Sequence, residues 1–239
     1  MNNHKLYDIE PRIKSMGSIS VPDVDYGDLK LQVMPFNNER AFKLPIAFSV
    51  WQSTFDELRS KIPLSSGLNN HHISIESRYF FLDDYLRREG LHIDGNFCLD
   101  DEFSYGENGE YRCGWGARPG WLYKSDKGGM VGVEEFELPY SGMPIEQGKY
   151  VSSKLGGLVV LSKYAGCNVY TDKIANAFVG PGGDLEHYRS QLLKPKLIAA
   201  DEVFFMTGDT PHESLKITKG NRRAFLRITL NHRYPNRLI

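Results

Sequence analysis

The sequence predicts a mainly β fold, a sandwich or barrel of short strands with few helices. Many short apolar runs, several alternating with polar residues, are separated by turn residues. Apolar residues at helical spacing stand out in two segments, 53–62 and 184–193. Strands and helices do not alternate along the chain, so the pattern gives no support for a parallel α/β sheet.

The composition indicates an ordinary globular protein. The chain has 239 residues, of which 41% are hydrophobic and 25% charged, enough for one large domain without stabilising crosslinks. The formal net charge of −1 creates no field that would favour a nucleic-acid partner. We see neither a signal peptide nor an apolar run long enough to cross a membrane, and therefore expect a cytoplasmic protein.

The cysteines support the same compartment. Cys98, Cys113 and Cys167 are an odd number at wide spacing, so they form neither a disulfide framework nor a Cys-x-x-Cys metal motif. We expect them to be reduced packing residues.

A single domain is expected over residues 1–239, with residues 1–70 as flanking elements and residues 71–239 as the core. Mixed, proline-containing sequence in the first part predicts short strands and loops. In the segment 53–62, Phe55, Leu58 and Ile62 predict a helix that Ser53 caps and Pro63 ends.

The core segment predicts strands interrupted by one insertion. Residues 73–75, 79–82 and 91–93 show alternating or apolar patterns. A segment of about 100–150 is rich in glycine and aromatic residues, among them Trp115 and Trp121, and predicts long loops and short hairpins.

The C-terminal third predicts further strands and one surface helix. Residues 157–163 and 167–170 are expected to form a hairpin, and 184–193 a helix capped by Asp184. Four more strands are expected at the end of the chain, namely 197–200, 203–207, 214–218 and 222–230.

His92 and Asp94 are the first candidate metal ligands. On a strand, alternation would put these two side chains on one face and Leu91 and Ile93 on the other. An imidazole and a carboxylate on one face can form two parts of a metal site, whereas the bland alternative is an exposed polar face.

His212 is the second candidate histidine. A turn at Gly208 and Asp209 follows an apolar strand and places His212 at the start of the next strand. His71 and His72 are weaker candidates. Adjacent side chains on a strand face opposite ways, so these two rings cannot easily reach one metal.

Arginines line one predicted face of the last strand. Arg223 and Arg227 alternate with Phe225 and Thr229 on that face, opposite an apolar row. The face is either a solvated surface or a polar pocket in which guanidinium groups bind carboxylates in pairs of hydrogen bonds.

Together these motifs resemble the Fe(II)/2-oxoglutarate-dependent oxygenase superfamily, over residues 91–94 and 203–230. Its members share a His-x-Asp motif, a distal histidine and a downstream arginine, here Arg223, eleven residues after His212 (223 − 212). The stretch 223–229 resembles the paired arginines of taurine dioxygenases, and the stretch 220–224 resembles phytanoyl-CoA hydroxylases. Two histidines and one carboxylate form the facial triad of non-haem Fe(II) oxygenases.

The resemblance implies a double-stranded β-helix, which is a jelly-roll fold like that of cupins, with a few flanking helices. It also implies that His92, Asp94 and His212 bind Fe(II). The interval of 120 residues between the two histidines (212 − 92) suits a member of the superfamily with an insertion.

The resemblance further implies a site for 2-oxoglutarate as co-substrate. Arg223 would pair with its distal carboxylate, Arg227 would support that site or meet an anionic substrate, and Thr229 would add a hydroxyl contact. A shift of register by one residue would exchange the faces of Arg222 and Arg223, so the anchor stays open among Arg222, Arg223 and Arg227.

The expected activity is that of a dioxygenase that hydroxylates a small molecule with dioxygen and releases succinate and CO2. Three alternatives stay open: a cupin-type metal enzyme without 2-oxoglutarate, an oxygenase that acts on a nucleobase or a protein side chain, and a non-catalytic jelly-roll binding module. Binding of iron, and its dependence on 2-oxoglutarate, separates the first and last of these from the expected activity.

Overall fold

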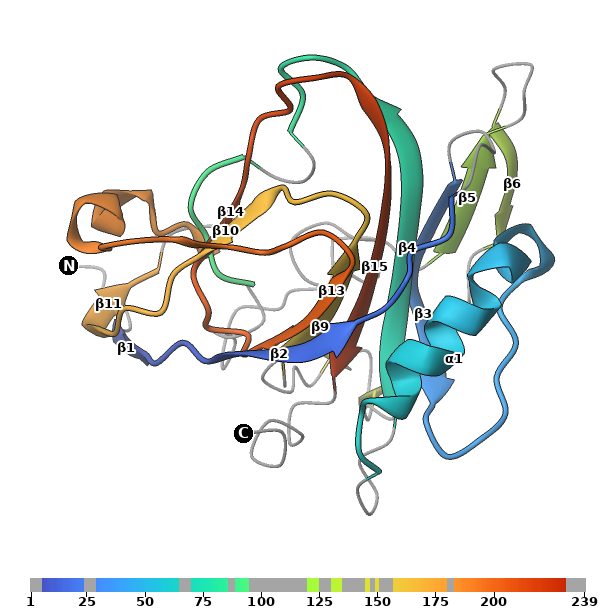
Figure 1. The fold of residues 1–239 in the computed structure, drawn as a ribbon. Coiled ribbons are helices and arrows are strands. Elements are labelled where there is room, and N and C mark those ends of the chain that lie inside the picture. The colour runs from blue at the N-terminus through green and yellow to red at the C-terminus, as the bar shows by residue number, and fades with distance from the viewer. Residues whose placement is uncertain are drawn as a thin grey trace.

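The computed structural model describes residues 6–23, 29–64, 70–85, 89–94, 120–124, 130–134, 145–146, 149–150, 157–179 and 183–230. Over these residues the chain is mainly β with antiparallel sheets and few helices, which confirms the predicted class (Figure 1). The helical elements are η1 (Ile46–Trp51), α1 (Gln52–Ser60) and η4 (Glu186–Gln191), where η denotes a 3-10 helix. The strands are β1 (Leu6–Ile9), β2 (Ile13–Ser18), β3 (Leu29–Asn37), β4 (Asn70–Phe80), β5 (Gly120–Lys124), β6 (Met130–Glu134), β7 (Ile145–Glu146), β8 (Lys149–Tyr150), β9 (Gly157–Ser162), β10 (Cys167–Val169), β11 (Ile174–Phe178), β12 (Lys196–Leu197), β13 (Glu202–Met206), β14 (His212–Ser214) and β15 (Asn221–Leu230).

Most of these strands belong to two sheets. The large sheet has the order β2-β13-β9-β15-β4-β3-β5-β6, and the small sheet has the order β12-β10-β14. β1 pairs with β11, and β7 pairs with β8. The backbone of His92 forms an isolated bridge to β14 and so extends the edge of the small sheet by one residue.

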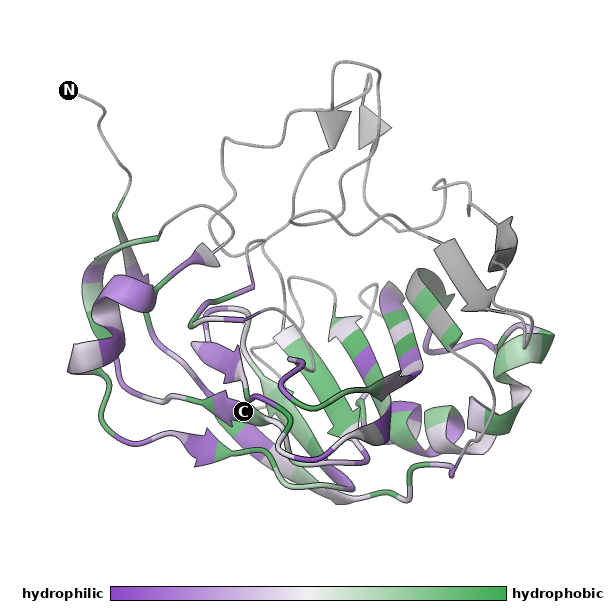
Figure 2. Ribbon diagram, turned by 90° about the horizontal axis from the view of Figure 1, so that it is seen from above, coloured by the Kyte–Doolittle hydropathy of each residue, from purple (hydrophilic) through white to green (hydrophobic). Residues whose placement is uncertain are grey.

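One face of the large sheet is covered by η1 and α1 (Figure 1). Phe48, Trp51, Phe55 and Leu58 are fully buried there against apolar side chains of the central strands. Ile62, just past the helix, is also buried, so all three predicted core positions of this segment are confirmed. Alternation along the strands sends every second residue to this helix-covered face. Figure 2 shows hydrophilic and hydrophobic bands along the strands of the described part of the chain.

The other face of the large sheet packs on the small sheet. The buried cluster between them joins Leu158, Val160, Phe204, Met206 and Phe225 of the large sheet to Val169 and Ile198 at the small sheet. We call this side of the large sheet its inner face. On β15 it carries Arg223, Phe225, Arg227 and Thr229, whereas Ala224, Leu226, Ile228 and Leu230 belong to the helix-covered core. The predicted division of this strand into two faces is therefore confirmed.

A third buried cluster surrounds residues 91–93. Leu91 and Ile93 pack with Ile9, Tyr170 and Leu185, as well as with Ile174, Ala177 and Leu192. The two apolar side chains that flank His92 are therefore fixed in a core, and the His92 side chain takes the opposite direction.

Several predicted elements differ from the structure. The strands expected at 197–200 and 214–218 share only one residue each with the observed strands, because β12 is Lys196–Leu197 and β14 is His212–Ser214. Residues 157–162 and 167–169 do not form a hairpin, because β9 pairs with β13 and β15 in the large sheet while β10 pairs with β12 and β14 in the small sheet. The segment 184–193 does contain a helix, but it is the short 3-10 helix η4, and the buried residues Leu185 and Leu192 flank it. Asp184 does accept a hydrogen bond from the Glu186 backbone N–H at 2.7 Å.

A smaller correction concerns the start of α1. Ser53 does not cap it, since η1 runs directly into α1 and Trp51 stands at the cap position without a side-chain hydrogen bond. Because η1 directly precedes α1, backbone carbonyls of η1 can accept the first N–H groups of α1, which a capping side chain would otherwise do.

Several expectations fall partly or wholly outside the described residues. The described sheets do not close into a barrel, so the jelly roll stays a prediction. Most of the segment of about 100–150, including Cys113 and Trp115, lies outside those residues, as does Cys98. Cys167 is a half-buried thiol that forms no disulfide with another described residue. No described helix is both long and apolar enough to cross a membrane.

Candidate functional site

His92 and His212 lie directly opposite each other on neighbouring backbone segments. The His92 N–H donates to the His212 carbonyl at 3.0 Å, and the His212 N–H donates to the His92 carbonyl at 2.8 Å. Directly opposed residues of an antiparallel pair project their side chains to the same face. The ring centroids are 4.5 Å apart. Two histidines that are 120 positions apart in sequence (212 − 92) are thus adjacent, as the metal hypothesis requires.

Each ring is oriented by a hydrogen bond from its Nδ1 to a backbone carbonyl. His92 Nδ1 lies 2.7 Å from the Gly90 carbonyl oxygen, and His212 Nδ1 lies 2.9 Å from the Thr210 carbonyl oxygen. A carbonyl oxygen only accepts, so each Nδ1 carries the hydrogen and the Nε2 of each neutral ring carries the lone pair. Histidines that bind metals are oriented by the same kind of second hydrogen bond.

The strand-like segment around His92 is fixed from both sides. On the side away from His212, the Ile93 N–H donates to Gly183 at 2.9 Å and the Leu185 N–H donates to Leu91 at 3.0 Å. Gly183 has φ +78°, and a Cβ built there would lie 2.1 Å from the Ile93 carbonyl oxygen. Only glycine permits this close approach, which holds His92 against β14.

Asp94 reaches toward the large sheet. Its Oδ1 lies 3.9 Å from Arg227 Nη1, and the Asp94 and Arg227 side chains are 25% and 17% exposed. The His-x-Asp motif therefore meets the inner face of β15, where the sequence placed the arginines. Among the described residues, no three His, Cys, Asp or Glu side chains form a group that could hold a metal ion. Asp94 as the third ligand stays a prediction.

Arg223 is buried on the inner face. It is 4% exposed, its Nε donates to Ser162 Oγ at 3.2 Å, and its guanidinium carbon lies 5.0 Å from the centroid of the Phe225 ring. Ser162, at the end of β9, is 5% exposed and donates in turn to the Tyr164 carbonyl at 2.8 Å. By alternation on β15, Arg223 and Arg227 share the inner face and Arg222 takes the other.

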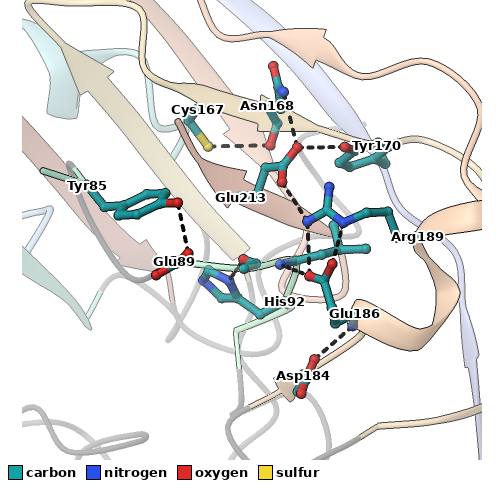
Figure 3. Close-up of polar contacts among 12 residues, drawn as sticks. Tyr85, Glu89, His92, Cys167, Asn168, Tyr170, Asp184, Glu186, Arg189 and Glu213 are labelled. Carbon is teal, nitrogen blue, oxygen red and sulfur yellow. Dashed lines mark hydrogen bonds and ion pairs between the residues drawn. The ribbon is translucent and has the colours of Figure 1, made fainter. Parts of the chain in front are cut away.

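A polar network that the sequence did not indicate joins the two histidine segments (Figure 3). Arg189 on η4 donates to Glu213 Oε2 at 2.8 Å and to Glu186 Oε2 at 3.0 Å. Glu213 directly follows His212, and Glu186 accepts the Leu91 N–H at 3.0 Å, directly before His92. One guanidinium therefore links the neighbours of both histidines. In the sequence, only the position of Glu213 next to His212 could have pointed to this network. The sequence does not show that Glu213 contacts Arg189.

The network accounts for the shifted pKa values in this region. Hydrogen bonds from Arg189, and then from the Leu91 N–H, lower the pKa of Glu186 from 4.5 to about 2. For Glu213, burial raises the pKa, but hydrogen bonds from Arg189, Tyr170 and Asn168 outweigh it and leave the pKa below its usual range. Burial, together with the 2.7 Å bond to Glu213, raises the pKa of Tyr170 to about 12.

His71 and His72 face opposite sides of β4, as the sequence predicted. His71 lies on the helix-covered face, with its ring centroid 5.7 Å from that of Phe36. His72 is 5% exposed and pairs in register with Thr229 on the inner face. Burial lowers the pKa of each ring to about 4, so both are neutral near pH 7.

Comparisons of the chain with protein-family models, with curated proteins and with solved structures find no match.

The Arg189 network predicts a specific acid sensitivity. The pKa of Glu186 is depressed in the folded protein, so its stabilising effect is present above pH 4.5 and is lost as the pH falls through about 2. In Arg189→Met the main cause of the depression is removed. Denaturant midpoints measured over this pH interval should therefore fall less steeply with acid than in the wild type.

Lys173→Met serves as the matched control, because it removes an exposed ion pair with Glu10 that has little effect on stability. If Arg189→Met loses stability with acid as steeply as the wild type and this control, the network does not depress the carboxylate pKa values.

Proposed function

We propose that the protein is an Fe(II)/2-oxoglutarate-dependent dioxygenase that hydroxylates a small molecule. The observation that carries the proposal is the pair of opposed imidazoles, His92 and His212, each with its Nδ1–H directed to a backbone carbonyl. This arrangement presents two Nε2 lone pairs from neighbouring backbone segments. It is the donor arrangement that a divalent first-row metal takes.

The path of the chain supports a double-stranded β-helix core. β9 of the large sheet is followed by β10 of the small sheet, β12 of the small sheet by β13 of the large sheet, and β14 of the small sheet by β15 of the large sheet. The segment around His92 follows the same rule, since it comes after β4 and joins β14. Successive strands that alternate between two facing sheets are typical of a jelly roll.

Three residues would hold the metal. His92 and His212 fit through Nε2, and Asp94 would add a carboxylate from the same segment as His92. When bound, Fe(II) and 2-oxoglutarate supply the oxidation of a substrate C–H bond by dioxygen, with succinate and CO2 as co-products. The protein's own part is to orient the two rings, to hold the acids on its arginines and to exclude water between its sheets.

Arg223 is the proposed anchor of 2-oxoglutarate. Its guanidinium is buried on the inner face, where Nε donates to the Ser162 hydroxyl oxygen, and a guanidinium can bind a carboxylate through several N–H groups. Arg227, already near Asp94, lies four residues further along the same strand face and is left for the substrate or for support of the site. Arg223 and Arg227 share the inner face and Arg222 does not, so both are better candidates than Arg222 for the anchor of 2-oxoglutarate.

Anaerobic absorption spectroscopy of the protein with Fe(II) tests the proposal. A weak visible charge-transfer band that needs both Fe(II) and 2-oxoglutarate is expected. His212→Ala should abolish the band and stoichiometric iron binding while the fold remains. His187→Ala is the matched control, because His187 is exposed on η4 and should leave the band intact.

The same experiment separates the alternatives. Iron binding without an effect of 2-oxoglutarate would indicate a cupin-type metal enzyme, and no iron binding would indicate a binding module. Tight stoichiometric iron in His212→Ala would show that the histidine pair is not the metal site.

Replacement of Arg223 tests the co-substrate site separately. In Arg223→Ala, loss of a buried charged pair should weaken 2-oxoglutarate binding by about 2–5 kcal/mol, measured by titration of the same band. Arg222→Ala, one residue away on the other face, should bind 2-oxoglutarate like the wild type. The anchor lies elsewhere if Arg223→Ala leaves the affinity unchanged.

A further inference from the structure

The Arg189 network lies on the outer face of the small sheet, on the opposite side from the two imidazoles. Val169 stands opposite His212 in the register of β10 and β14 and is buried between the two sheets, so His212 also faces inward. The next pair in that register, Asn168 and Glu213, therefore faces outward, and Asn168 donates to Glu213 Oε1 at 3.2 Å. A guanidinium that binds Glu213 on the outer face acts on the inner face only through the backbone.

The same guanidinium spans the backbone segment that carries His92. This segment lies between β14 and residues 183–185 and is joined to each by an isolated bridge. Arg189 Nη2 donates to Glu213 of β14 at 2.8 Å and to Glu186, just beyond the other neighbour, at 3.0 Å, and its Nε also donates to Glu186 (Figure 3). The two carboxylates are thus tied together across the His92 segment.

This link is stronger than the bridge that it spans. The His92 segment pairs with β14 through two hydrogen bonds between neutral backbone groups. Hydrogen bonds between a guanidinium and a carboxylate are roughly twice as strong as neutral ones. The Glu213 side chain is only 13% exposed, so water screens its bond to Arg189 less than it screens a surface ion pair. Arg189 therefore provides the main restraint on separation of β14 from the His92 segment.

We propose that Arg189 is a positioning residue that sets the separation of His92 and His212, and thereby the affinity of this pair for a divalent metal. The inference rests on the proposed function for its use, since the metal would be the Fe(II) of the dioxygenase. Glu213 directly follows His212, and Glu186 accepts the backbone N–H directly before His92. Two rings bind one ion only at a suitable spacing, so looser segments bind it more weakly.

Charge and position predict opposite effects when Arg189 is removed. Loss of a positive charge favours a nearby cation, because the Coulomb repulsion between the two disappears and two carboxylates lose their counter-charge. Loss of a positioning contact disfavours the cation, because the two rings are then held less well for one ion. A lower metal affinity in Arg189→Met therefore cannot be an effect of the charge alone.

Titration of the metal-free full chain with Co(II), followed by visible absorption, measures this effect. Arg189→Met should raise the dissociation constant of Co(II) by about 10-fold or more and alter the d–d absorption bands. Arg189→Lys keeps the charge but lacks the planar fork that reaches two carboxylates, and should give an intermediate value. Lys173→Met is the matched control. It removes an exposed ion pair with Glu10 and should bind Co(II) like the wild type.

Hydrogen exchange in the metal-free chain gives a readout that needs no metal. The amides of His92 and His212 donate to each other's carbonyls, and both should lose protection in Arg189→Met. A merely structural role would lower the melting temperature without changing the Co(II) affinity measured well below it. Tyr170→Phe removes only the hydroxyl that donates to Glu213 at 2.7 Å, and should change both readouts in the same direction by less. This variant replaces Arg189→Met if the latter does not fold.

The proposal is overturned if Arg189→Met binds Co(II) as tightly as the wild type or more tightly, or if the two amides keep their protection. Failure of the proposed function gives other results. If His212→Gln binds Co(II) like the wild type, the histidine pair is not the metal site and Arg189 has nothing to position. If the Co(II) and exchange results are as expected but 2-oxoglutarate produces no charge-transfer band with iron, the oxygenase is rejected and Arg189 remains a positioning residue of a metal site.

Discussion

The two backbone hydrogen bonds between His92 and His212 are the constraint on which the site depends. They fix the two side chains on one face, at neighbouring positions, with the ring centroids 4.5 Å apart. Three neighbouring features keep the bonded pair in register. Leu91 and Ile93 are buried in a core, Gly183 allows the outer segment to approach closely, and Arg189 links Glu213 to Glu186. A site built in this way is assembled by folding, before any ligand arrives.

The large sheet makes the complementary contribution. Alternation along β15 gives one strand two tasks, because its apolar residues complete the core under α1 while its arginines point toward the small sheet. Burial of Arg223 at 4% exposure is unfavourable in an apolar environment, and the Ser162 hydroxyl and the Phe225 ring offset part of that penalty. The buried polar groups on the inner face therefore lower the stability of the folded protein. The apolar residues of this face pack on the small sheet, and its arginines would bind acids under the proposed function.

The sequence predicted features that depend on local periodicity. The buried positions of α1, the two faces of β15 and the opposite directions of His71 and His72 all follow from spacings of 3.6 or 2 residues. The pairing of segments that are distant in sequence was harder to predict. β9 and β10 look like a hairpin because a short turn joins them, yet they pair in different sheets. Arg189 and Glu213 meet only because η4 packs beside β14, and their sequence separation of 24 residues carries no signal of it.

The histidine pair was reached through a resemblance of motifs rather than through periodicity. The resemblance selected His92 and His212 from seven histidines, and the fold places these two side by side. The buried atoms His72 Nε2 and Arg227 Nε lie in residues that the sequence had judged a weak ligand and a supporting cation. Their burial in the structure changes this interpretation. The local sequence pattern does not predict whether a polar residue is buried.

Proton NMR of the Co(II)-loaded protein tests the central claim most directly. Two histidines that bind through Nε2 while each Nδ1–H donates to a carbonyl should give two hyperfine-shifted, solvent-exchangeable signals. One signal should disappear in His92→Gln and the other in His212→Gln. Absence of shifted exchangeable signals, or their persistence in both variants, would contradict the assignment of His92 and His212 as metal ligands.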